Sequence, residues 1–147
     1  YIKKVHNLAI GDRTAEDIKI KIGNAILQKQ PEKMEINGRD LMLGLPRALE
    51  ISANEVNEAV KDHLIEIVRT VKKVLSETPP EIAADIINKG MVLTGGSSLL
   101  KNLDELFYRE TGVPAYVSND AMFCVAKGTG IAIEHLDVYK KSVMSKK

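Results

Sequence analysis

The ten residues Gly-Met-Val-Leu-Thr-Gly-Gly-Ser-Ser-Leu, at positions 90–99, decide the fold class of this chain. Residues 91–94 are a compact apolar run, which is typical of a strand buried on both faces. Two glycines follow directly, and apolar residues with helical spacing then continue to Gly112: Leu99, Leu103, Leu106 and Phe107. A strand, a glycine turn and a helix in this order predict an α/β protein.

The two glycines, Gly95 and Gly96, favour a ligand-binding turn. Because they lack a Cβ atom, a sugar or a phosphate can approach the backbone closely. The first N–H groups of the helix that we expect there would favour an anion. The pattern matches neither the Walker A motif nor G-x-G-x-x-G. From these residues alone, a tight turn in which glycine only avoids a clash remains an alternative.

A long helix is expected over residues 54–77. Ser52 and Glu55 have the spacing of a capping box. Pro79 and Pro80 end the helix, because neither can donate a backbone hydrogen bond. Seven apolar positions step by three or four residues: Val56, Val60, Leu64, Ile67, Val68, Val71 and Leu75. This spacing predicts one continuous buried face.

A first helix is expected to begin at Thr14, which has Asp17 in the capping-box position. Its buried face would carry Ile18, Ile22 and Ala25. Glu16 and Lys19 lie three residues apart on this helix. They could clamp the edge of a polar ligand, or form an exposed helix pair that contributes about 0.2–0.5 kcal/mol.

The remaining elements are shorter. Residues 28–51 predict a small β-rich patch with a turn at Asn37-Gly38. Toward the C-terminus, the sequence predicts a helix at 81–89 ending at Gly90, a strand at 113–117, and a last helix that is capped by residues 118–120 and interrupted at 128–130.

The composition excludes several classes of protein. The 147 residues are 44% hydrophobic and 28% charged, as in globular domains. A net charge of +1 argues against a nucleic-acid binder, and 4% aromatic residues argue against a stacking platform. The single cysteine, Cys124, cannot form an internal disulfide, so a reducing cytoplasmic setting is expected. We find no metal-ligand spacing among the three histidines and no Ser-His-acid arrangement.

Six ordered motifs resemble the MreB/Mbl rod shape-determining proteins, the bacterial homologues of actin. They are AIGDRTAEDIK at 9–19, GRDL at 38–41, GLPR at 44–47, PPE at 79–81, GMVLTGG at 90–96 and CVAKGTG at 124–130. The resemblance extends from residue 1 to about residue 137 and covers the C-terminal part of such a protein. Because the chain begins with Tyr1, we expect it to be a piece of a longer one.

The resemblance implies an actin-like ATPase fold, α/β with an α+β outer subdomain, of which this chain would be part of the second lobe. Residues 1–11 would end a helix that enters from upstream. Residues 12–70 would form the small outer subdomain, and 71–137 the closing half of the inner subdomain. The basic tail, residues 138–147, is expected to be disordered.

The resemblance also implies which residues bind the adenosine side of ATP. On the first helix they are Glu16, Asp17, Ile18 and Lys19, and in the glycine turn they are Gly95, Gly96, Ser97, Ser98 and Leu99. Many relatives have Gly-Ala where this chain has Ser97-Ser98. In the family, the residues that bind phosphate and Mg²⁺ and orient the hydrolytic water lie upstream. We therefore expect no catalytic residue and no metal site here, with Mg-ATP bound only by the intact protein.

The implied function is that of an ATP-binding, filament-forming cytoskeletal protein, and a slow ATPase when intact, that governs cell shape by organising cell-wall synthesis. Its implied partners are copies of itself and the cell-wall elongation machinery, with no nucleic acid. It would be cytoplasmic, at the inner face of the cell membrane, with membrane contact only through upstream parts. Two alternatives remain: another actin-superfamily ATPase, Hsp70-like or sugar-kinase-like, and a non-catalytic α+β interaction module. The motifs at 11–14 and 38–41 argue against the first.

Overall fold

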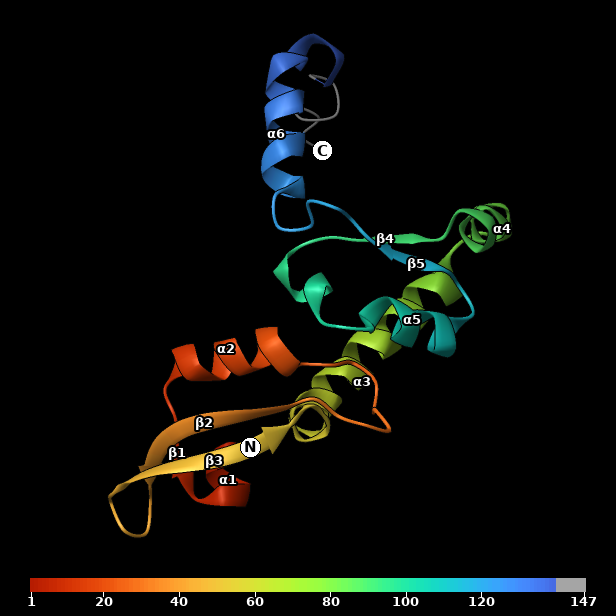
Figure 1. Ribbon diagram of the computed structural model, residues 1–147. Helices are drawn as coiled ribbons and strands as arrows, with labels where there is room; N and C mark the ends of the chain where they lie inside the picture. The colour runs from red at the N-terminus through yellow and green to blue at the C-terminus, as the bar shows by residue number, and fades with distance from the viewer. Residues whose placement is uncertain (140–147) are drawn as a thin grey trace.

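The computed structural model describes residues 1–139, which form two groups of elements along one long helix, α3 (Figure 1). In chain order the elements are α1 (Ile2–His6), β1 (Leu8–Ala9), α2 (Asp12–Ile22), β2 (Lys33–Asp40), β3 (Pro46–Ser52), α3 (Ala53–Glu77), α4 (Pro80–Lys89), β4 (Met91–Leu93), the 3-10 helix η1 (Gly96–Leu99), α5 (Leu103–Thr111), β5 (Ala115–Val117) and α6 (Cys124–Glu134). The mixture of helices and two small sheets agrees with the expected α/β class.

The first group is an antiparallel sheet, in the order β1-β2-β3, packed against α2 and the start of α3. The sheet register pairs Leu8 with Asp40 and Ile36 with Leu49. Buried aliphatic side chains from the sheet and both helices form one core: Leu8, Ile18, Ile22, Ile36, Ile51, Ala53 and Val56. This core holds α2 in place.

The expected turn at Asn37-Gly38 is wrong, because β2 runs straight through these residues and Asn37 pairs with Ala48 of β3. Gly38 is needed for a different reason. A Cβ atom there would lie 2.6 Å from the backbone oxygen of Ala9, so glycine lets β1 approach β2.

The hairpin turn lies after β2 instead, and Asp40 organises it. The Asp40 carboxylate accepts the N–H groups of Met42 and Leu43 at 2.8 and 2.9 Å. Gly44 adopts a left-handed conformation with φ 72°. The hydrogen bonds from Met42 and Leu43 are the main reason why the pKa of Asp40 lies below its usual value, and the nearby Arg47 charge lowers it further.

Helix α2 begins earlier and ends earlier than expected. Its N-cap is Gly11, which makes no side-chain cap bond, so the Thr14 capping box is wrong. The helix ends at Ile22, because Gly23 departs from helical geometry and a Cβ there would lie 2.2 Å from the Lys19 oxygen. Ala25 is therefore outside the helix, and it is buried in the other core.

The capping box of α3 is confirmed. Ser52 Oγ accepts the Glu55 N–H at 3.3 Å, and Glu55 Oε2 accepts the Ser52 N–H at 2.9 Å. The single buried face is only partly present, since Ile67 is 45% exposed. Two cores contact this helix at different places, and Ile67 is rotated about 100° from Val68, away from the second core.

The second group contains the parallel strands β4 and β5, with α5 and the middle of α3 beside them. Its buried residues are Ala25, Leu64, Val68, Leu103 and Phe107. Val92 of β4 is 70% exposed, so the expectation of a strand buried on both faces is wrong for the described residues. Within them this sheet has two strands, which cannot cover both faces.

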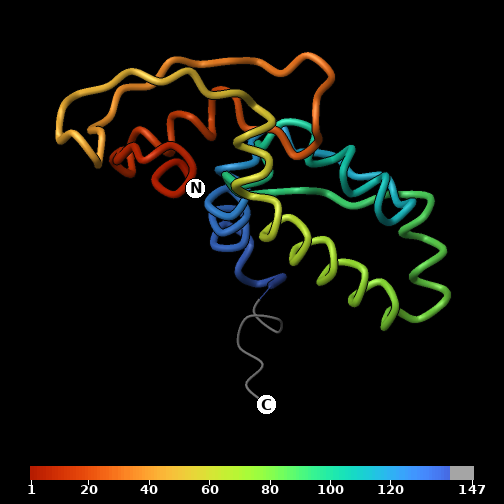
Figure 2. Tube along the Cα trace, turned by 90° about the horizontal axis from the view of Figure 1, so that it is seen from below, coloured from red at the N-terminus to blue at the C-terminus, as the bar shows by residue number. Residues whose placement is uncertain are grey.

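Two expected C-terminal helices differ from the structure. The helix after the glycine turn is divided into η1 and α5 by Leu100–Asn102, and Asn102 has φ 58°. Helix α6 begins at Cys124, has no side-chain cap bond, and runs through Gly128 and Gly130 without interruption. It stands away from both groups, and no residue within its bounds is buried (Figures 1 and 2).

Part of the predicted basic tail, residues 140–147, lies outside the described residues. Among residues 1–139, no helix combines the length and the apolarity that crossing a membrane would require.

Candidate functional site

The glycine turn is anchored at its first residue. Gly95 has φ 86° and ψ 165°, a backbone conformation that is essentially restricted to glycine. Its N–H donates to the Ala121 oxygen at 2.7 Å, which ties the turn to the segment after β5. The role of Gly95 is therefore conformational.

Gly96 has a different role. Its φ is not left-handed, and a Cβ placed there would contact nothing within 4 Å. A side chain could thus be added without a clash, but it would occupy the open space in front of the backbone. This space fits the close approach of a sugar that the sequence suggested for the turn.

The two serines that follow are not equivalent either. Ser98 is buried, and its hydroxyl donates to the Gly95 oxygen at 2.7 Å. Ser98 therefore supports the turn from behind, whereas Ser97 and Leu99 are exposed. The expected full helix behind the turn is wrong: η1 is only four residues of 3-10 helix, and α5 begins at Leu103. An anion at Gly95 would therefore not lie at the first turn of an α-helix.

The four predicted residues on α2 are divided between surface and core. Glu16, Asp17 and Lys19 are exposed, whereas Ile18 is buried between α2 and the first sheet. Glu16 and Lys19 precede Gly23 by about 10 and 6 Å along the helix axis. Both side chains are therefore available to a ligand that lies along α2.

The structure brings α2 and the glycine turn together through Lys101, just after η1. The Ala25 N–H donates to the Lys101 oxygen at 2.8 Å. Lys101 Nζ donates to the Lys21 oxygen at 2.7 Å and reaches Glu32 at 2.8 Å. In Figure 1 the turn accordingly lies next to the C-terminal end of α2. The segment that follows α2 and the segment that follows η1 are thus in direct contact, although Ala25 and Lys101 are more than 70 residues apart in the sequence.

A cavity of about 570 Å³ was not predicted from the sequence. Its walls come from α1, β1, α2, the sheet and α3, and its polar lining residues are Lys3, His6, Lys19, Arg39 and Glu55, besides Tyr1. Lys19 also belongs to the predicted site. The sequence also singled out Glu55, but only as part of the capping box of α3.

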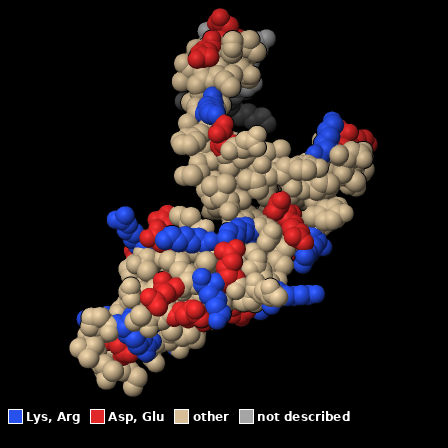
Figure 3. Space-filling model, in the orientation of Figure 1, with Lys and Arg blue, Asp and Glu red and all other residues tan. Residues whose placement is uncertain are grey.

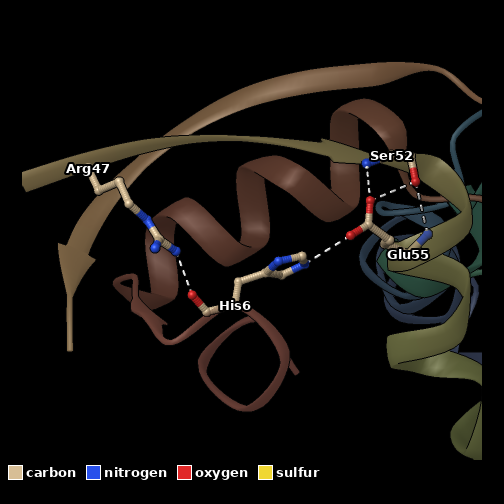
Figure 4. A network of polar contacts seen from close by, with 4 residues as sticks. All are labelled: His6, Arg47, Ser52 and Glu55. Carbon is tan, nitrogen blue, oxygen red and sulfur yellow. Dashed lines mark hydrogen bonds and ion pairs between the residues drawn. The ribbon is translucent and has the colours of Figure 1, made fainter. Parts of the chain in front are cut away.

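Two of the polar residues that line this cavity, His6 and Glu55, contact each other (Figure 4). His6 Nε2 lies 2.9 Å from Glu55 Oε1, and the His6 backbone oxygen accepts a hydrogen bond from Arg47. Burial raises the pKa of Glu55, but the hydrogen bonds from Ser52 and His6 outweigh it, so this pKa lies below its usual value. The network ties α1 to α3 and to the hairpin.

Charges of both signs are interspersed over the face that contains α2 and the first sheet, whereas the region of β4 and β5 is largely uncharged (Figure 3). Among the described residues, no group of three or more His, Cys, Asp or Glu side chains is close enough to hold a metal ion.

Comparison with solved structures defines the class of protein. The structure of MreB5 from Spiroplasma citri bound to AMPPNP has a TM-score of 0.87 and 33% identity, covering 98% of this chain and 43% of that one. The MamK double helical filament has a TM-score of 0.73 at 18% identity and covers 91% of this chain and 41% of that one, which supports the fold. The chain therefore has the fold of part of an actin-like protein.

The family follows from the sequence comparisons. The family model described as MreB/Mbl protein matches residues 1–141. The cell shape-determining protein Mbl of Bacillus cereus is 45% identical over 144 residues, covering 98% of this chain and 43% of that protein. MreB of Escherichia coli is 42% identical over 145 residues, covering 99% of this chain and 42% of that protein. The chain belongs to the MreB/Mbl family, and the family resemblance noted in the sequence is confirmed. The chain spans less than half the length of these relatives.

Proposed function

We propose that this chain is part of an ATP-binding, filament-forming bacterial cytoskeletal protein that governs cell shape by organising cell-wall synthesis. The names of the Mbl and MreB relatives support the link to cell shape. The MreB5 relatives, which were crystallised with AMPPNP and with ADP, support nucleotide binding. The filament of MamK supports self-association only through the shared fold.

Within such a protein, this segment would bind the adenosine side of the nucleotide between α2 and the glycine turn. The observation that carries this proposal is the open space at Gly96, beside a turn that Gly95 and Ser98 hold in place. Gly96 would admit the ribose to the backbone, and Glu16 and Lys19 would hydrogen-bond polar edges of the nucleoside. Asp17, Ser97 and Leu99 would border the ligand, while Ile18 and Ser98 would act by holding α2 and the turn.

ATP itself would supply the hydrolysable phosphates, and the residues that position them with Mg²⁺ would lie in the rest of the protein. Two subdomains, at 12–70 and 71–137, would close on the nucleoside, with residues 1–11 as the connection from upstream. The intact protein would be a slow ATPase at the inner face of the cell membrane, in contact with the cell-wall elongation machinery.

Titration of the ¹⁵N-labelled 147-residue chain with adenosine and with Mg-ATP, followed by NMR, tests the proposal. We expect concentration-dependent shifts of the Gly95, Gly96 and Ser97 amides, together with Glu16 and Lys19. Gly96→Val should abolish these shifts and leave the other amide resonances unchanged, because the valine side chain fills the open space without a clash.

Gly130→Val is the matched control, since a Cβ at this exposed helical position also contacts nothing within 4 Å. It should bind as the unchanged chain does. Shifts confined to the cavity beside His6, or equal shifts in Gly96→Val and the unchanged chain, would contradict the proposed site.

A further inference from the structure

Three asparagines meet where α2, α3 and α5 converge. Asn57 Nδ2 donates to the Asn24 backbone oxygen at 2.9 Å, and Asn102 Nδ2 donates to Asn24 Oδ1 at 3.0 Å. Asn24 is only 1% exposed, and Asn57 is also buried. We call these three residues the asparagine junction. It connects segments that are 33 and 78 residues apart.

The orientation of the Asn24 amide follows from its neighbours. The backbone N–H of Ile26 donates to Asn24 Oδ1 at 3.0 Å, and a backbone N–H can only be a donor. The other side-chain atom must therefore be the amide nitrogen. Within residues 1–139 this buried Nδ2 has no hydrogen-bond partner, although buried polar groups normally have one. The Asn24 amide nitrogen, which carries two N–H donors, is therefore buried without an acceptor among the described residues.

Asn102 adds a second unusual feature. It is a non-glycine residue with φ 58°, at the break between η1 and α5. Asparagine tolerates this left-handed conformation better than most residues do. The same residue thus sets the backbone direction after the glycine turn and bonds the end of α2. A side chain without an amide would lose the second role.

The position of the junction relates it to the candidate site. Residues 23–25 follow α2, and residues 100–102 follow η1, so the junction joins the two segments that flank the proposed nucleoside site. Two other features connect the two groups: the Lys101 contacts with Lys21, Ala25 and Glu32, and helix α3, which is continuous over 25 residues. A change in the spacing between α2 and the glycine turn would act on the asparagine junction together with the Lys101 contacts.

We propose that Asn24, Asn57 and Asn102 are positioning residues that set the spacing between α2 and the glycine turn, and through it the affinity for the adenosine nucleotide. The part that concerns affinity rests on the proposed function.

Asn102→Gly tests the proposal, because glycine accepts the left-handed backbone but lacks the donor to Asn24. Spin labels at Ile20→Cys and Met122→Cys, both exposed positions, report the spacing by pulsed EPR in a Cys124→Ser background. We expect a narrow distance distribution for the unchanged junction and a broad one for Asn102→Gly, even without nucleotide.

Mg-ATP should shift the distance distribution of the chain with the unchanged junction. Asn102→Gly should bind Mg-ATP about tenfold more weakly, as expected for the loss of one hydrogen bond. Asn102→Asp, which keeps the size and the backbone tolerance but also removes the donor, should behave like Asn102→Gly and provides a second variant if the first does not fold. Asn88→Ala, at an exposed position on α4, is the control and should leave both readings unchanged.

Equal distributions and affinities in Asn102→Gly, Asn102→Asp and the unchanged junction would overturn the proposal. So would a loss of affinity without any change in the distance distribution. Absence of any nucleotide response in the unchanged chain, together with broadening in both variants, would instead contradict the proposed function and support the spacing role of the junction.

Discussion

Leu64 tests whether α3 is a scaffold. Its side chain is 8% exposed and packs in the second core beside Ala25, Val68, Leu103 and Phe107. Leu64→Ala removes most of this apolar contact. The part of the chain from α5 to β5 depends on the same core, so we expect the loss to affect the whole second group.

The surroundings of Leu64 narrow the range expected for the loss of stability in Leu64→Ala. Replacing a buried leucine by alanine destabilises proteins by about 2–5 kcal/mol, and by most where a closed cavity remains. Leu64 lines an open surface depression of about 190 Å³, together with Asn57 and Ile65. Because water can enter an open depression, we expect about 2–3 kcal/mol. For a domain of this size, that corresponds to a decrease in Tm of about 4–12 °C.

Urea unfolding followed by far-UV circular dichroism measures the change in the free energy of unfolding. Ile67→Ala is the matched control on the same helix, since Ile67 is 45% exposed and lies outside both cores, and its replacement should change stability by less than about 0.5 kcal/mol. Equal effects of the two substitutions would refute the reasoning. A stable Leu64→Ala variant would mean that this face of α3 does not hold the second core together.

Three further predictions concern the glycine turn, Asp40 and the response of the 147-residue chain to ATP. Gly95→Ala should lower Tm and shift the Ser98 amide resonance, because φ 86° is unfavourable for a residue with a side chain, whereas Gly96→Ala should leave Tm unchanged. Equal melting temperatures of the two variants would contradict the different roles of Gly95 and Gly96. Because the pKa of Asp40 is lowered in the folded chain, its contribution to stability is present above about pH 4 and is lost as the pH falls through its folded-state pKa. Urea unfolding should therefore show that the difference in the free energy of unfolding between the unchanged chain and Asp40→Asn shrinks toward pH 2.5. A difference that stays constant over this pH range would show that the ionisation of Asp40 does not contribute to stability. The 147-residue chain should release phosphate from ATP at the background rate and bind Mg-ATP by calorimetry with a Kd weaker than about 1 μM, and a tighter Kd or measurable hydrolysis would show that it holds more of the site than we infer.

Local chemistry made several elements predictable from the sequence alone. The capping box of Ser52 and Glu55 and the proline stop at Pro79 each act within a few residues, and the structure agrees with both. The glycines that end α4 and α5, Gly90 and Gly112, have the left-handed φ that such positions favour. The ordered family motifs also located both segments of the candidate site, although their binding roles remain predictions.

Long-range contacts decided the rest, because they join residues that no local pattern connects. Gly38 reads as a turn until β1 is seen to pass within contact of its backbone. Glu16 and Gly96 are 80 positions apart in the sequence, and it is the contacts of Lys101 and of the asparagine junction that join the segments following α2 and η1. The different roles of Gly95 and Gly96 depend on backbone angles and empty space, which exist only in the folded chain.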